Sequence, residues 1–274
     1  LGVLGDPEIW EYDVTAALIR AGVGHAFEVN GLRSFAYAPP LWSFVLAACP
    51  RSLIQFVQAL LCLAAALCCG AIAESLTGRA RAGLLAAILV AIQPSLLFYS
   101  VVKSDPLPMN AALVSALALV SLRAVSSLDV RLAGLAGGLI GLATLGRGSP
   151  GLLAPLVAAA FVVRSGRRGL RAATCLLGVA LIVVAPWILR NLSVVGAPVL
   201  TTTTWENFWR GNNPDATGGA YDAQGRSLSV ASGDYSRFPA TVQRALRTGT
   251  EIERDRAFRA EALAWIRDNP LAWL

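Results

Sequence analysis

Ser52–Ala73 reads SLIQFVQALLCLAAALCCGAIA, an apolar stretch without a single Asp, Glu, Lys or Arg. A helix needs roughly 17–25 mostly apolar residues to cross the ~30 Å hydrocarbon core of a bilayer. This stretch is therefore long enough to span a membrane. Five more apolar stretches follow, at 82–100, 106–122, 132–145, 152–163 and 170–189. The stretches 132–145 and 152–163 are short and rich in Gly, Ala and Leu, which predicts tightly packed helices or a re-entrant pair.

The composition of the whole chain supports the same class. Charged residues make up only 15% and hydrophobic residues 55%, with a mean hydropathy of +0.59. Soluble domains carry roughly a quarter of charged residues. The sequence therefore predicts an all-α polytopic membrane protein with about six transmembrane helices, outer-face juxtamembrane helices and a C-terminal outer-face polar region.

Arginines gather in alternate loops and so predict the orientation. By the positive-inside rule these loops are cytoplasmic. The net charge of +6 then reflects membrane orientation, and no nucleic-acid partner is expected. We expect three parts: a first outer loop at 1–51, a helical bundle at 52–190 and an outer polar region at 191–274. The arginines concerned are Arg79, Arg81, Arg123, Arg131, Arg164, Arg167, Arg168 and Arg171.

The outer segments have patterns of their own. Residues 9–21 have the spacing of an amphipathic helix, and 41–48 read as an interfacial helix after Pro39-Pro40. Residues 251–267 regain helical character before Asn269-Pro270 interrupts them. The chain starts at Leu1 and ends within a helical pattern, so we expect both ends to be cut from a longer protein.

Two acids are candidates for catalysis. Asp6, with Glu8 close by, precedes the first amphipathic helix, and a carboxylate there can act as a base toward a bound hydroxyl. Asp105 stands where a helix enters the membrane, a costly place for an unpartnered charge. Both acids could also have a purely structural role. Asp6 would then stabilise the N-terminus of the following helix, and Asp105 with Pro106 would form an N-cap and N1 pair.

Basic and aromatic residues form the candidate binding set. Arg33, Lys103 and Arg147 lie on the expected outer side, where a guanidinium or ammonium suits a lipid phosphate. Each can equally be an interfacial residue that reaches toward water. Trp205, Asn212 and Asn213 lie in a polar loop whose aromatic faces and amides suit a carbohydrate, although many loops share this composition.

The order of these features resembles the bacterial GT-C glycosyltransferases of the dolichyl-phosphate-mannose mannosyltransferase-like group, whose relatives include the aminoarabinose transferase of lipid A. The similarity covers nearly the whole chain and depends on order and sidedness rather than on one diagnostic motif. It rests on Asp6, Leu32–Trp42, Gln93-Pro94, Tyr99-Ser100, Ser104–Pro106, Ala185–Asn191 and Gly211–Pro214.

The resemblance implies an enzyme of the inner (plasma) membrane whose active site lies on the periplasmic or extracellular side. Its donor would be a polyprenyl-phosphate sugar, and its acceptor a lipid, protein or polysaccharide hydroxyl. Asp6 would be the base of an inverting transfer, and Asp105 would position the acceptor or the base. Related transferases often have a basic residue before the Pro-Pro pair, where this chain has Ala38. Phosphate binding then falls to Arg33, Lys103 and Arg147.

No cofactor is required by this chemistry, and a divalent metal is compatible but not demanded. The chain has one histidine, His25, and its five cysteines lack metal-ligand spacing, so no metal site is predicted.

Two other functions fit the same pattern. A transporter or lipid-flipping protein would place charged or broken-helix sites near the middle of the bilayer. Here the predicted spans carry almost no ionisable residues, and the polar groups gather on one side. A scaffold that binds envelope sugars without turnover would keep the aromatic loop but would not need Asp6 and Asp105 to converge.

Overall fold

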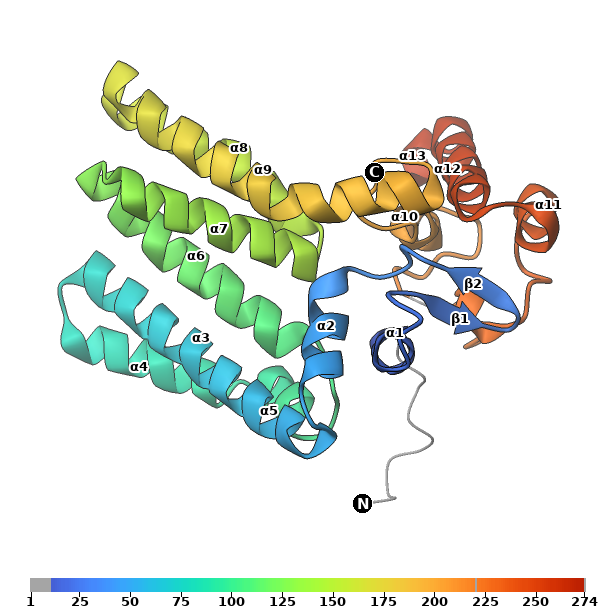
Figure 1. Ribbon diagram of the computed structural model, residues 1–274, viewed down its shortest axis with the longest axis horizontal. Coiled ribbons are helices and arrows are strands. Elements are labelled where there is room, and N and C mark those ends of the chain that lie inside the picture. The colour runs from blue at the N-terminus through green and yellow to red at the C-terminus, as the bar shows by residue number, and fades with distance from the viewer. Residues whose placement is uncertain (1–10, 220, 274) are drawn as a thin grey trace. The chain divides into compact units, whose positions relative to one another are not determined.

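The computed structural model describes residues 11–219 and 221–273, and helices dominate it (Figure 1). The chain divides into two compact units. The first, Pro39–Trp187, is called the apolar unit below. The second, called the polar unit, combines two segments that are distant in sequence, Leu1–Ala38 and Ile188–Leu274.

The helices of the apolar unit follow the apolar stretches of the sequence. Each of the six stretches coincides with a helix or a pair of helices, and α3 packs against both α4 and α6. Gly78 adopts the left-handed backbone conformation (φ 66°), which ends α3 and lets the chain reverse into α4. The elements are α2 (Pro40–Ala48), the 3-10 turn Arg51–Leu53, α3 (Ile54–Thr77), α4 (Ala80–Ala91), α5 (Pro94–Val101), α6 (Leu107–Ser127), α7 (Val130–Gly146), the 3-10 turn Ser149–Leu152, α8 (Leu153–Ser165) and α9 (Arg167–Val195).

Three helices in the described part of the chain are long and apolar enough to cross a membrane, namely Arg51–Thr77, Leu107–Ser127 and Arg167–Val195. A fourth span results if α4 and α5, bent by 51° at their junction, count as one broken helix. The expected total of about six is therefore not confirmed. The 17 residues of α7 rise only about 25 Å at 1.5 Å each, and the following apolar segment is equally short.

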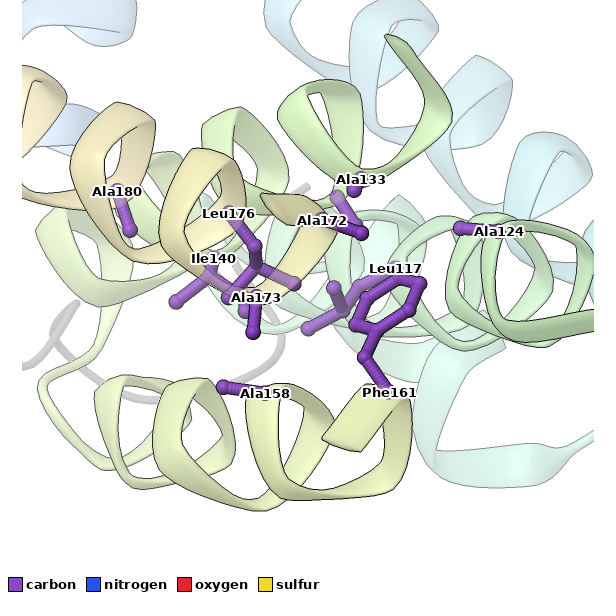
Figure 2. Close-up of a cluster of buried hydrophobic side chains, with 11 residues drawn as sticks. Leu117, Ala124, Ala133, Ile140, Ala158, Phe161, Ala172, Ala173, Leu176 and Ala180 are labelled. Atoms are coloured by element: carbon purple, nitrogen blue, oxygen red, sulfur yellow. The ribbon is translucent and has the colours of Figure 1, made fainter. Parts of the chain in front are cut away.

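Small side chains let the helices of the apolar unit approach closely. One cluster of buried residues joins α6, α7, α8 and α9, and alanine is its commonest residue (Figure 2). Phe161 of α8 and Leu117 of α6 meet in the middle of this cluster, and Leu176 of α9 points into it. A methyl group added at Gly137 would lie 2.3 Å from the carbonyl oxygen of Leu176. The α7 backbone thus touches the α9 backbone, as small residues permit in membrane helices.

The polar unit begins with α1 (Glu11–Arg20) and a β-hairpin. Strands β1 (Phe27–Val29) and β2 (Leu32–Ser34) pair antiparallel, with Val29 opposite Leu32. Asn30 (φ 51°) and Gly31 (φ 76°) form the two-residue turn between them. Both residues tolerate positive φ, which the tight hairpin turns require. The sequence analysis did not predict this hairpin.

The second segment of the polar unit supplies the end of α9 and four further helices. Thr250 and Glu253 form a capping box at the start of α12, where helical character was expected. The core holds three aromatic rings, since Phe258 of α12 lies 5.5 Å from both Trp209 and Phe238 between ring centroids. The elements are α10 (Thr204–Gly211), the 3-10 turn Val230–Ser232, α11 (Ala240–Thr248), α12 (Glu251–Asp268) and α13 (Pro270–Trp273).

Two neighbouring glycines of α7 provide a test of this close packing. We expect Gly137→Ala to lower the stability by about 1–3 kcal/mol, because its methyl group would collide with the Leu176 carbonyl. Gly138→Ala is the matched control, since its methyl group meets only Val179 at 3.9 Å and alanine favours helix. Thermal unfolding of the detergent-solubilised protein measures both variants. Equal midpoints for the two would contradict the α7–α9 contact.

Candidate functional site

The predicted site residues fall into three groups. Asp6 and Glu8 lie outside the described residues. Two further groups belong to different units: Lys103, Asp105 and Arg147 to the apolar unit, and Arg33, Trp205, Asn212 and Asn213 to the polar unit.

Asp105 lies in the short loop between α5 and α6. Its Oδ1 accepts a hydrogen bond of 2.7 Å from the backbone N–H of Leu107, one of the unpaired donors at the start of α6. Burial raises the pKa of Asp105, while the Leu107 bond and the charges of Arg147 and Lys103 lower it. The charges of Lys103 and Arg147 thus act on Asp105, although the two cations lie in different loops.

The end of α7 lies close to the start of α6. Gly146 ends α7, and a methyl group there would lie 2.7 Å from Oδ1 of the buried Asn110 in α6. Glycine at position 146 therefore permits the close approach of the two helix ends. Arg147 follows directly and is exposed.

Arg33 and Trp205 each have a partner within the polar unit. Arg33 donates from Nε to Oε2 of Glu28 at 3.1 Å, as a cross-strand pair of the hairpin. The guanidinium of Arg259 lies 5.0 Å from the ring centroid of Trp205. Such pairs are common on protein surfaces. The proposed contacts of Arg33 and Trp205 with a substrate stay predictions.

Asn212 and Asn213 complete the end of α10. Asn213 is buried and donates from Nδ2 to the carbonyl of Trp209 at 2.8 Å, while its Oδ1 accepts from Asp215 N–H at 2.8 Å. Asn212 donates to the carbonyl of Phe208 at 2.7 Å. These bonds satisfy carbonyls that the helix leaves unpaired. The side-chain amides that were expected to bind a carbohydrate thus also cap a helix.

An acidic cluster that the sequence analysis missed lies in the polar unit. Glu206 of α10, with Glu251 and Asp255 of α12, lines a cavity of about 30 Å³ together with Tyr37 and hairpin residues. A water molecule needs roughly 10–15 Å³ of such space, so the cavity has room for about two or three waters and is too small for a sugar ring.

Glu251 and Glu206 use their oxygens within the fold. Glu251 accepts from the backbone N–H groups of Phe35 (2.7 Å) and Ala36 (2.9 Å), and from the Thr202 hydroxyl (2.5 Å). Glu206 accepts from Arg210 Nη2 at 2.5 Å and from the N–H of Val230 at 3.0 Å. Both carboxylates therefore tie distant segments together as charge-assisted acceptors.

Asp255 differs from its two neighbours. It is buried, and its Oδ1 accepts one hydrogen bond of 3.2 Å from the N–H of Trp205. Burial, together with the negative charges of Glu206 and Glu251, raises the pKa of Asp255 to about 6 against the lowering effects of the Trp205 bond and Arg259. This carboxyl group can therefore exchange a proton close to neutral pH.

Arg190 anchors the end of α9 within the polar unit. Its guanidinium donates to the carbonyls of Phe35 at 2.6 Å and His25 at 2.8 Å. Burial lowers the pKa of His25 to about 4, so its imidazole is neutral at physiological pH. Arg190 thereby joins the segments before and after the hairpin, which makes it a structural residue of the fold.

Nothing among the described residues assembles a metal site, since no group of three or more His, Cys, Asp or Glu side chains could hold an ion. Comparisons with protein-family models, with curated proteins and with solved structures each gave no significant match.

The variant Asp255→Asn tests the raised pKa of Asp255. The folded-state pKa of Asp255, about 6, is above its usual value of 3.8, so its contribution to stability is present below pH 3.8 and lost as pH rises through 6. We expect the variant to be more stable than the wild type at pH 7.5, by up to about 2–3 kcal/mol. The measurement is the thermal midpoint from pH 4 to 8.

Glu251→Gln, one helical turn earlier, is the matched comparison. Its carboxylate accepts three hydrogen bonds, and an amide would turn a donor toward at least one of those donors, so we expect a lower midpoint at every pH. If Asp255→Asn lowered the midpoint at pH 7.5 as Glu251→Gln does, the raised pKa of Asp255 would be refuted.

Proposed function

We propose that this chain is a membrane glycosyltransferase that moves a sugar from a polyprenyl-phosphate donor to an acceptor hydroxyl. The resemblance described above motivates the reaction class and the outer-face location in the cell membrane. Helices apolar enough to cross a membrane support a lipid-linked substrate, because a polyprenyl chain must remain in the bilayer while its phosphate meets the protein.

The observation that supports the proposal is that Asp105 lies at the start of α6, where the charges of Lys103 and Arg147 act on it. A carboxylate under the influence of two cations, at the end of an apolar helix, offers both functions that the transfer needs. The cations can bind the phosphate of the donor, and the carboxylate can orient a hydroxyl group.

The chemical step is a displacement at C1 of the sugar. Asp6 takes the proton of the acceptor hydroxyl, and that oxygen forms a new bond to C1 from the face opposite the leaving group. The bond between C1 and the phosphate oxygen breaks, and its electron pair leaves with polyprenyl phosphate. Lys103 and Arg147 stabilise the added negative charge, and Asp105 positions the acceptor. The configuration at C1 is inverted.

The break between α4 and α5 favours a second candidate, a transporter. Discontinuous helices often form the substrate sites of transporters near the middle of the bilayer. This break, bent by 51°, holds Ile92 and Gln93 and no charged residue. A transporter would move its substrate without cleaving the donor, so donor consumption separates the two functions.

The test uses the full-length protein in membranes with radiolabelled polyprenyl-phosphate sugars. We expect Asp6→Asn to lower transfer by about 10²–10⁴-fold, because a positioned base contributes that much. Asp105→Asn should lower transfer while donor binding survives, because it removes the negative charge but keeps an acceptor for Leu107.

Asp129→Asn is the matched control. Asp129 also accepts a hydrogen bond at a helix start, from Arg131 N–H at 2.7 Å, but it lies at the opposite end of α6. Transfer by Asp129→Asn should equal that of the wild type. Equal transfer by Asp6→Asn and the wild type would remove Asp6 from the mechanism, and intact donor in every preparation would favour the transporter.

A further inference from the structure

Gln58 of α3 holds the loop that carries Lys103 and Asp105. Its side chain is fully buried. The amide nitrogen Nε2 donates to the carbonyl of Tyr99 at 2.6 Å and to that of Lys103 at 3.0 Å, with the carbonyl of Asp105 at 3.4 Å. One NH₂ group thus bonds to a carbonyl in the last turn of α5 and to two carbonyls of the loop.

The orientation of this amide follows from its surroundings. If Oε1 and Nε2 exchanged places, an oxygen would face three carbonyl oxygens, so the donor end must point at the loop. Oε1 has no hydrogen-bond partner among the described residues. An apolar side chain would avoid that unpaired acceptor, so the contribution of Gln58 lies in the bonds it donates.

A second glutamine of the same helix gives a weaker contact. Gln55 donates from Nε2 to the carbonyl of Val101 at 2.9 Å and is exposed. Val101 is the last residue of α5, and its carbonyl has no helical partner. Gln55 therefore supports the end of α5, whereas Gln58 reaches the loop itself.

Asp105 and Ser104 of the loop differ in their bonding. Leu107 N–H binds Asp105 Oδ1, and the buried hydroxyl of Ser104 has no partner among the described residues. The charged groups that act on Asp105 are Lys103 of the same loop and Arg147 after α7. The position of the carboxylate relative to Arg147 thus depends on where the loop backbone is held.

We infer that Gln58 is a positioning residue, whose amide fixes residues 102–106 and with them the place of the Asp105 carboxylate at the start of α6. The effect on turnover rests on the proposed function. The effect on the loop and on Asp105 itself does not.

Hydrogen exchange measures the loop directly. In full-length protein in lipid nanodiscs, we expect Gln58→Leu to speed amide exchange in a peptide covering 102–107 by about tenfold or more, because the loop loses its donor. Gln58→Asn, one methylene shorter, should do the same since it cannot reach the carbonyls. Ser75→Ala is the control at the other end of α3, where the Ser75 hydroxyl bonds only to the carbonyl of Ala71.

A second readout reports on Asp105 without any turnover. A hydrophobic carbodiimide reacts with protonated carboxyl groups, so its labelling of Asp105 follows that group's protonation with pH. Release of the loop exposes Asp105 to water, and we expect the midpoint of labelling to move to lower pH in both Gln58 variants but not in Ser75→Ala. A side chain that only stabilised the fold would leave this midpoint unchanged.

Several results would overturn the inference. Unchanged exchange at 102–107 in both Gln58 variants would show that the loop does not depend on the amide. Faster exchange spread equally over α6 and α7 would show general loosening of the bundle. Faster loop exchange with an unmoved labelling midpoint would show that Asp105 is held by something else.

Turnover separates this inference from the proposed function. If the wild type transfers sugar, the Gln58 variants should lower kcat more than they raise KM. If no preparation consumes donor, the proposed function fails, while exchange and labelling still decide the role of Gln58.

Discussion

A helix that crosses a membrane must satisfy its backbone groups without water, and three helices in the described part of the chain are long and apolar enough for that environment. A helix satisfies its own N–H and C=O groups except at its ends. Side chains complete two of these ends: Gln93 caps the start of α5 through Leu96 N–H, and Asp105 accepts from Leu107 N–H at the start of α6. The candidate site lies at the second of these helix starts.

The same requirement explains what the sequence could predict. Long apolar stretches located the helices of the apolar unit, because a helix is the structure that hides its backbone in lipid. They did not give the number of spans, because α7 is near the minimum length and Gln93-Pro94 marks a helix boundary without showing how far the chain bends there. Helix length and bending depend on packing against neighbours, which a single sequence does not state.

The polar unit shows the complementary limit. Asn30-Gly31 between apolar residues was a readable hairpin signal that the sequence analysis did not use. The acidic cluster had no comparable signal, because Glu251 bonds to Phe35 across 216 positions of the chain. Asn212 and Asn213 were predicted to bind a sugar because the composition of their loop is typical of sugar-binding loops. In the structure, both side chains donate hydrogen bonds to carbonyls at the end of α10. Composition indicates which groups are present, and only the fold shows which of them are already engaged.

The bond between Glu251 and the chain at Phe35–Ala36 has a consequence for biosynthesis. A ribosome adds roughly 5–20 residues per second, so about 10–40 s separate the two partners as they are made. During that interval the helices of the apolar unit are synthesised and can enter the membrane, while the hairpin has no carboxylate to close against. The early segment therefore lacks this partner until Glu251 has been made, and the polar unit is completed only after the apolar helices that interrupt its sequence.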